Sequence, residues 1–443
     1  MLWQYGFLPK PESPIAPLPN RSHLSHMQKS YFARNRWKLW LAPWLEMDWL
    51  LLLLIIGLTA FGGIVIRSTE LQLGYTDWWQ HWIVGGIGTA LALFFARCRY
   101  ENLINWKWVI YGVTNASLIA VMVIGTEALG AQRWITIGSF NIQPSEFAKL
   151  GMIITLAALL EQRTADTIPA IVKTLAITGV PWALVFIQPD LGTSLVFGAI
   201  TLPMLYWGNA NPGWLILMVS PLVSAILCGV YFPGWLAWVN LMGLVGWRSF
   251  PQRWFGALGG MALNLASGEL GTLLWKILKD YQKDRIILFL NPERDPLGGG
   301  YHLIQSRIAI GAGELWGQGL YKGAQTQGNF IPEQHTDFIF SAIGEEFGFV
   351  GGVILLFVFW LICLRLVMIA QNAKDNFGSL LAIGVLAMIV FQTVVNIGMT
   401  IGLAPVTGIP LPWLSYGRSA MLTNFMAIGI VESVARSKPE RKF

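Results

Sequence analysis

An acidic and a basic side chain stand three residues apart at the start of an apolar stretch. Glu146 and Lys149 belong to the segment QPSEFAKL, in which Pro144 suits the first turn of a helix. The spacing places both side chains on one helix face. Ionic groups inside a membrane span normally face a cavity or each other. The sequence therefore leaves two interpretations open, a functional cavity and a purely structural pair.

A second segment, QPDLGTSL, repeats the combination of glutamine, proline and an acid at the start of an apolar stretch. Asp190 either caps the following helix or belongs to a site. The helix dipole favours an acid at the start of a helix, so the position of Asp190 does not distinguish these two roles.

A third polar group, His335, Thr336 and Asp337, directly precedes the apolar run Phe338 to Phe340. Asp337 is suited either to capping a helix or to accepting a proton as a general base. His335 is also able to act as a base, and we interpret it as a positioning residue. Glu345 and Glu346 follow, and we interpret them as residues of a helix start, with orientation of the site as the second reading.

The elements that position these residues are membrane helices. The chain of 443 residues is 54% hydrophobic and 12% charged, whereas an ordinary soluble domain is roughly a quarter charged. A formal charge of +6 does not indicate nucleic acid binding. Three scattered cysteines exclude a disulfide framework, and five histidines without metal-ligand spacing argue against structural zinc.

Apolar runs long enough for a bilayer predict an all-α polytopic membrane protein with about twelve spans. Two of the runs, Trp235 to Trp247 and the one after Phe255, also fit re-entrant or interfacial segments. The predicted spans are Trp49 to Ile66, Trp82 to Ala96, Val109 to Ile124, Pro144 to Leu160, Ile168 to Ile187, Leu191 to Trp207, Trp214 to Phe232, Trp235 to Trp247, Phe255 to Leu278, Phe347 to Ile369, Phe377 to Ile401 and Ala420 to Val434.

Basic residues collect in alternate loops, which predicts that both termini are cytoplasmic. Residues 1–45 form a cytoplasmic tail, residues 46–435 the membrane domain and residues 436–443 a second tail. The basic residues of the predicted inner loops and C-terminal tail are Arg97, Arg99, Lys107, Arg163, Arg248, Arg253, Arg365, Lys374, Arg436, Lys438, Arg441 and Lys442.

Two irregular segments interrupt this pattern. Residues 279–341 are polar and glycine-rich and are predicted to form a large extracytoplasmic loop. They form either a solvated connection or a functional segment, and their length and apolar runs favour function. Leu403 to Ser419 carries three prolines and three glycines between two spans. Irregular backbone at that depth is tolerated only when it is buried in protein or lines a cavity.

Six motifs, in this order, resemble the SEDS family (shape, elongation, division and sporulation). They are QRWITIGSFNIQPSEFAKL, QPDLGTSL, YQKDRI, GYHLIQSRIAIG, PEQHTDFIFSAIGEEFG and TGIPLPWLSYG. The resemblance extends from about Trp49 to the C-terminus. The sequence at Tyr301-His302, Ala324 to Gln327 and Gly408 to Pro412 resembles the elongation, rod-shape-determining branch rather than the division branch.

The resemblance implies a peptidoglycan glycosyltransferase that polymerises lipid II into β-1,4-linked glycan strands during cell elongation and cell-shape maintenance. It would act at the extracytoplasmic face of the bacterial cytoplasmic membrane, with a class B penicillin-binding protein (transpeptidase) and the elongation machinery as partners. Asp337 is the implied catalytic base. A divalent cation, Mg²⁺ or Mn²⁺, is a conjecture, because no metal motif is visible. The predicted substrate-binding residues are Arg133, Glu146, Lys149, Arg285, Gln305, Ser306, Arg307, His335 and Thr336.

The sequence departs from the family pattern in three places. Arg418 and Glu314 stand where glycine is usual, which leaves close packing or phosphate contact there in doubt. Residues 214–278 contain an added helix pair, and an even insertion preserves the topology.

The competing function is a flippase or transporter of a lipid-linked precursor, which cavity charges and broken helices would also serve. A third reading, a non-catalytic scaffold, leaves Asp337 and Lys149 unexplained.

Overall fold

The computed structural model describes residues 46–71, 77–128, 131–138, 140–277, 283, 287–289, 291–296, 298 and 300–437. All the helices below belong to one compact unit, Asp48–Phe443. The predicted N-terminal tail and Arg285 lie outside the described residues.

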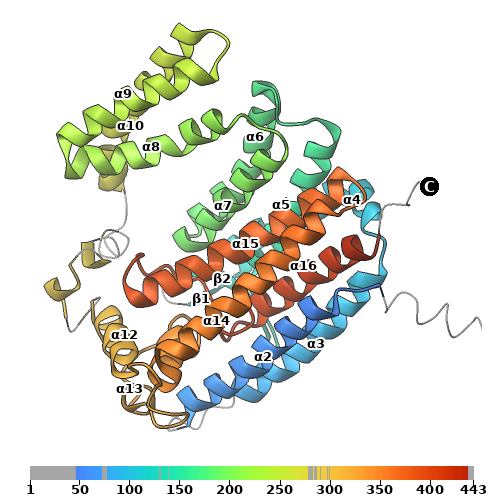
Figure 1. Cartoon of the computed structure of the whole chain (residues 1–443), viewed down its shortest axis with the longest axis vertical. Coiled ribbons are helices and arrows are strands. Elements are labelled where there is room, and N and C mark those ends of the chain that lie inside the picture. Colours follow the sequence, from blue (N-terminus) through green and yellow to red (C-terminus); the bar gives the residue numbers. More distant parts are fainter. Residues whose placement is uncertain are drawn as a thin grey trace, which may run out of the picture. The chain divides into compact units, whose positions relative to one another are not determined.

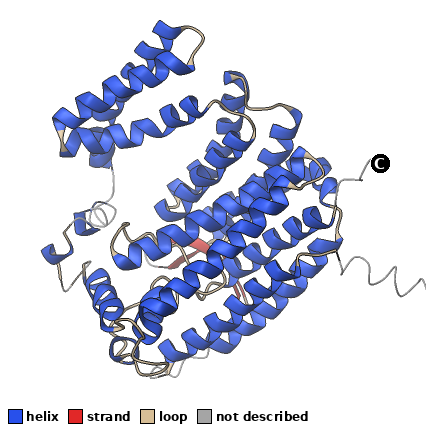
Figure 2. Cartoon of the chain, in the orientation of Figure 1, coloured by secondary structure: helices blue, strands red, loops and turns tan. Residues whose placement is uncertain are grey.

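Long helices dominate the chain (Figure 2). Each of the twelve predicted apolar stretches corresponds to one helix, which confirms the all-α membrane class. Six of these helices, α2, α4, α6, α8, α14 and α15, are long and apolar enough to cross a bilayer, so twelve spans remain a prediction. The helices are α2 (Trp49–Glu70), α3 (Asp77–Arg97), α4 (Leu103–Ile124), α5 (Pro144–Gln162), α6 (Ile168–Ile187), α7 (Leu191–Trp207), α8 (Pro212–Val230), α9 (Phe232–Ser249), α10 (Arg253–Ile277), α14 (Ile339–Gln371), α15 (Asn376–Ile401) and α16 (Arg418–Arg436).

Local sequence sets where several helices begin. The side chains of Asp48, Asp190 and Asp375 cap α2, α7 and α15 by accepting backbone N–H bonds. Large apolar side chains stay exposed along the helices, as at Val123, which is 78% exposed. Such surfaces are unfavourable in water and suit lipid.

Two helices form the centre of the bundle. Of the 19 residues of α5, 16 are buried, and α15 is buried along most of its length. Helix α15 packs against α5, α7, α14 and α16, and α3 lies along α16 (Figure 1). Polar groups on α5 and α15 are therefore enclosed by protein rather than exposed to lipid.

Helices α8, α9 and α10 contain the predicted insertion and pack mainly on one another. Both α9 and α10 are continuous helices, not broken re-entrant segments. A buried polar network joins the three helices. The indole N–H of Trp235 donates to Ser224 Oγ at 2.8 Å, and Asn264 Nδ2 donates to Ser220 Oγ at 2.9 Å.

A small antiparallel sheet connects α4 to α5 and was not predicted. Its strands are β1 (Thr126–Ala128), β2 (Ala131–Ile137) and β3 (Phe140–Ile142), in the order β1-β2-β3. The β2–β3 pairing places Ile135 opposite Ile142. This sheet carries Arg133, which lies on β2.

The described part of residues 279–341 is folded rather than a simple solvated connection. It contains η2 (Pro292–Arg294), α12 (Tyr301–Ala312) and α13 (Ala324–Gln327). Ala309, Ile331 and Phe338 form a small apolar core, against which Val406 packs. The next helix, α14, begins at Ile339, before the predicted start at Phe347, and is broken at Gly348 (φ 65°).

The insertion generates a test of topology. Arg248 and Arg253 flank the exposed turn between α9 and α10, so we expect this turn to be cytoplasmic. In a chain whose three cysteines are replaced by serine, Gln252→Cys should react with a membrane-impermeant maleimide only after cells are permeabilised. Lys322→Cys, in the predicted extracytoplasmic segment, should react in intact cells. Labelling of Gln252→Cys in intact cells would show the insertion to be misplaced.

Candidate active site

The second half of the irregular segment between α15 and α16, from Ile409 to Ser415, is largely buried inside the bundle, whereas Leu403 and Gly408 in its first half are exposed. The segment starts at Gly402, in the left-handed conformation, and turns again at Gly408, whose φ is 74°. Ile409, Leu411 and Trp413 are at most 2% exposed. Buried backbone without helical pairing must find other hydrogen-bond partners.

Asn396 of α15 supplies one of these partners. Its side-chain amide donates to the backbone oxygen of Asp337 at 2.9 Å and to that of Ile409 at 2.8 Å. Asn396 is completely buried. One amide group therefore holds the loop that carries Asp337 against the irregular segment. Asn396 was not predicted as a site residue, because a polar residue inside an apolar helix gives no signal of its partners.

Asp337 occupies the last loop position before the N-cap of α14. The N-cap residue is Phe338, which does not match the helix-cap reading of Asp337. The Asp337 side chain is half-buried. A Cβ added at Gly408 would lie 3.6 Å from Asp337 Oδ2, so the carboxylate lies beside the turn of the irregular segment.

The two residues before Asp337 are also anchored. The backbone oxygen of His335 accepts a bond from Tyr416 N at 2.9 Å, and Thr336 Oγ1 donates to Glu333 Oε2 at 3.1 Å. Burial lowers the pKa of His335, while the charges of Glu333 and Asp77 act in the opposite direction. Desolvation thus favours the neutral imidazole. The positioning role of the His335 side chain remains a prediction.

Arg133 joins two of the predicted motifs. Its guanidinium donates to the backbone oxygens of Gln188, at 3.3 Å, and of Pro189, and lies 3.9 Å from Asp190 Oδ1. Asp190 also caps α7 by accepting bonds from Thr193, so the cap reading is confirmed. Arg133 keeps 25% of its side chain exposed.

The same α7 terminus contacts the irregular segment. A Cβ added at Gly192 would lie only 2.4 Å from the backbone oxygen of Thr407, so only glycine permits this approach. From α16, Ser419 accepts a bond from Gln143 N at 2.9 Å. The QPDLG and QPSE segments and the residues around Asp337 therefore meet at the irregular segment.

Glu146 and Lys149 form an enclosed ion pair. Lys149 Nζ lies 2.8 Å from each carboxylate oxygen of Glu146, and both residues are at most 2% exposed. The structure thus shows the pairing that was one of the two readings. Contact of Lys149 with substrate remains a prediction.

The predicted residues on α12 have different environments. Ser306 is completely buried and bonds to Ser341 Oγ at 2.6 Å and to the oxygen of Thr400 at 2.7 Å, so its hydroxyl ties α12 to α14 and α15. Arg307 is exposed and donates to the oxygen of Gly402 at 3.2 Å. Gln305 is half-buried on the same helix.

Glu345 and Glu346 lie inside α14, because this helix begins at Ile339. Glu345 accepts bonds from the backbone of Gln325 and Thr326, at 2.7 and 2.8 Å. Glu346 accepts bonds from Ser68 and from Tyr321 N. The helix-start reading was wrong, and the two carboxylates orient the loop around α13 instead.

Arg418, one of the departures from the family pattern, is engaged by protein. Its guanidinium donates to Gln80 Oε1 at 2.6 Å and to the Tyr416 hydroxyl at 2.9 Å. The arginine therefore stabilises the end of the irregular segment against α3.

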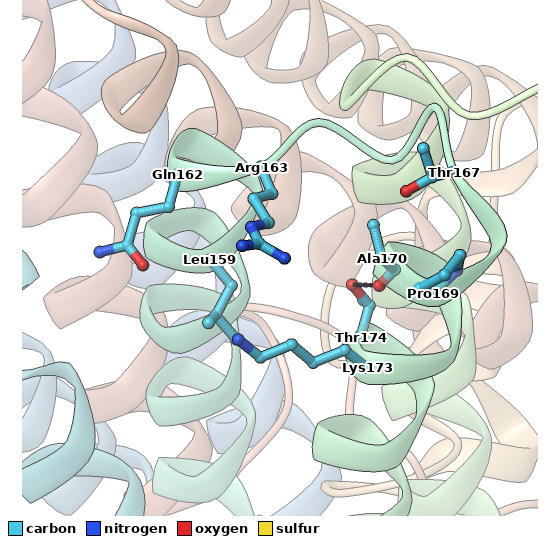
Figure 3. A pocket seen from close by; sticks show the side chains of 8 residues that line it. All are labelled: Leu159, Gln162, Arg163, Thr167, Pro169, Ala170, Lys173 and Thr174. Carbon is cyan, nitrogen blue, oxygen red and sulfur yellow. Dashed lines mark hydrogen bonds between the residues drawn. The ribbon is translucent and has the colours of Figure 1, made fainter.

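A cavity of about 350 Å³ lies between the C-terminal end of α5 and the start of α6. Arg163 and Lys173 extend into the space between the two helices, with Thr167 at its rim (Figure 3). Glu146 is at the opposite end of α5. The cavity is thus separate from the polar groups around Asp337.

Comparison with known proteins decides the family. The profile of the cell cycle protein family of FtsW, RodA and SpoVE matches residues 44–440. The chain belongs to the SEDS family. Among its SEDS relatives, the peptidoglycan glycosyltransferase RodA of Treponema pallidum is 35% identical, with 88% of this chain and 97% of that protein covered. The peptidoglycan glycosyltransferase MrdB of Escherichia coli (strain K12) is 33% identical over 88% of this chain and 93% of its own length.

Solved SEDS structures have the same fold. A chain from a peptidoglycan synthase complex that coordinates polymerization and crosslinking superposes with a TM-score of 0.67 at 28% identity, covering 89% of this chain and 99% of that one. The rod-shape-determining protein RodA of Thermus thermophilus gives a TM-score of 0.59 at 25% identity, over 89% and 98% of the two chains.

The enclosed ion pair predicts a large effect of single substitutions. Lys149→Met should lower the free energy of unfolding by about 3–5 kcal/mol, because Glu146 would remain buried and unpaired. Adding Glu146→Gln should restore most of that loss. The measurement is thermal unfolding of the purified protein in nanodiscs.

The matched control is Arg99→Met, which removes an ion pair with Glu101 whose arginine side chain is 74% exposed. It should change stability by less than about 1 kcal/mol. A Lys149→Met protein as stable as the wild type, or a double variant no better than the single one, would contradict the structural pairing.

Proposed function

We propose that this chain, a peptidoglycan glycosyltransferase of the SEDS family, uses Asp337 as the general base of glycan polymerisation. The observation that carries the proposal is the placement of Asp337. Its loop is fixed to α15 by Asn396, and its carboxylate lies beside Gly408 of the irregular segment. A base needs such fixed geometry relative to the proton that it accepts.

The substrate is lipid II, a disaccharide joined to a lipid through pyrophosphate. Asp337 accepts the proton of the acceptor sugar 4-hydroxyl, whose oxygen attacks the anomeric carbon of the donor. The bond from that carbon to the pyrophosphate breaks, and the electron pair leaves with the lipid pyrophosphate. Attack opposite the leaving group converts the α-linked donor into a β-1,4 bond.

Fixed cations favour the departing pyrophosphate by offsetting its charge. Arg307 suits this role because it is exposed on α12, next to the end of α15. Arg133 also retains partial exposure beside the α7 terminus. Lys149 is enclosed in an ion pair with Glu146 and is the third candidate cation. A divalent cation, Mg²⁺ or Mn²⁺, would supply further positive charge.

The protein works at the extracytoplasmic face of the bacterial cytoplasmic membrane, with both termini in the cytoplasm. The distribution of basic residues supports this orientation. A class B penicillin-binding protein is the proposed partner, within the elongation machinery. The similarity to a chain of a complex that coordinates polymerization and crosslinking supports a partner of this kind.

Substitution of Asp337 tests the mechanism. Asp337→Asn keeps the shape of the side chain but cannot accept the proton, so polymerisation of labelled lipid II by the purified protein with its partner should fall about 100-fold or more. Thermal stability should stay close to that of the wild type. Asp166→Asn, at an exposed position between α5 and α6, is the matched control and should polymerise normally.

Two results would contradict the proposal. The first is a stable Asp337→Asn protein that polymerises lipid II at the wild-type rate. The second is a wild-type protein that translocates lipid II across vesicle membranes without forming glycan, which would favour a transporter.

A further inference from the structure

Three potential metal ligands meet next to the loop that carries Asp337. Glu70 is the last residue of α2, Asp77 is the first residue of α3, and His335 lies two residues before Asp337. One ligand atom from each residue lies within 4.8 Å of the other two. Residues from two distant parts of the chain thus converge on one point.

Glu70 is a buried carboxylate. It is 2% exposed, and its Oε2 accepts a bond from Trp78 N at 3.2 Å. Among the residues that the structure describes, its Oε1 has no hydrogen-bond partner. A buried oxygen without a partner is costly, and charge on a carboxylate increases the cost.

The surroundings add to this cost. Glu70 ends α2, where the helix dipole disfavours negative charge, and Asp77 brings a second carboxylate close to it. Within the described ranges, no ion pair joins Glu70 or Asp77 to a lysine or arginine. A positive charge between the two carboxylates would offset the cost of the unpartnered oxygen, of the helix dipole and of the repulsion between the carboxylates.

We propose that Glu70, Asp77 and His335 bind a divalent metal cation. Two carboxylates and an imidazole suit Mn²⁺, whereas Mg²⁺ prefers oxygen ligands alone. This assignment deepens the proposed function, since it gives residues to the cation that polymerisation of a pyrophosphate-linked donor would use. The orphaned Oε1 of Glu70 is the observation that distinguishes this cluster from an ordinary group of surface acids.

The position of the three residues defines what cation binding would do for the protein. Two of the ligands lie at the end of α2 and at the start of α3, and the third belongs to the Asp337 loop. That loop is already held from the other side, by Asn396 and by the bond from Tyr416 N to the His335 oxygen. Binding would therefore fix the loop to α2 and α3 and order Asp337 without contact to it.

Direct titration with Mn²⁺ tests the site independently of activity. The full-length protein in nanodiscs is titrated with MnCl₂, and free Mn²⁺ is measured by electron paramagnetic resonance. We expect one saturable site in the wild type. Glu70→Gln and Asp77→Asn, which retain size but remove a ligand charge, should each weaken binding by about tenfold or more. Mn²⁺ should also raise the unfolding temperature of the wild type and have little effect on the two variants.

Two controls separate this inference from the catalytic proposal. Glu314→Gln removes one exposed carboxylate elsewhere in the large loop and should bind Mn²⁺ like the wild type. Asp337→Asn should lose polymerisation but keep Mn²⁺ binding. No saturable site in the wild type, or equal affinity in the wild type, Glu70→Gln and Asp77→Asn, would overturn the metal site. Failure of the catalytic proposal would leave the Mn²⁺ titration unchanged.

Discussion

The side-chain amide of Asn396 is the interaction on which the candidate site depends. Its two bonds, to the backbone oxygens of Asp337 and Ile409, join the loop before α14 to the irregular segment between α15 and α16. A non-helical segment buried in a membrane protein needs hydrogen-bond partners that lipid cannot give. Asn396 meets this need and in doing so fixes the residue that we assign as the base.

The other motifs of the family build outward from this segment. Gly192 allows the start of α7 to reach Thr407. The side chain of Arg133 holds the turn before α7 by donating to backbone oxygens of that turn. Glu345 and Glu346 bind the backbone of the large loop from inside α14. Most of these charged side chains therefore bind protein backbone. In this way they position the few side chains that remain available to the substrate.

Regular features were predictable from the sequence because they depend on local pattern. Apolar runs located every long helix, and Asp190 caps α7, as its position before an apolar run suggested. Residues whose role depends on distant contacts were not predictable. Asn396 lies near the end of an apolar run, and the contacts of Glu70 arise only because α3 and the Asp337 loop approach it. The apolar stretch predicted to start at Phe347 begins next to the break at Gly348, but the short helical part before that break, from Ile339, was not predicted.

The central claim is that Asn396 acts on catalysis through Asp337, and a double-mutant cycle tests it most directly. Polymerisation of lipid II is measured for the wild type, Asn396→Ala, Asp337→Asn and the double variant, each checked for thermal stability. If Asn396 serves to place the base, Asn396→Ala should slow the wild type strongly and have little further effect once Asp337 is replaced. Equal fold-losses from Asn396→Ala in both backgrounds would contradict the account, because the two residues would then act independently.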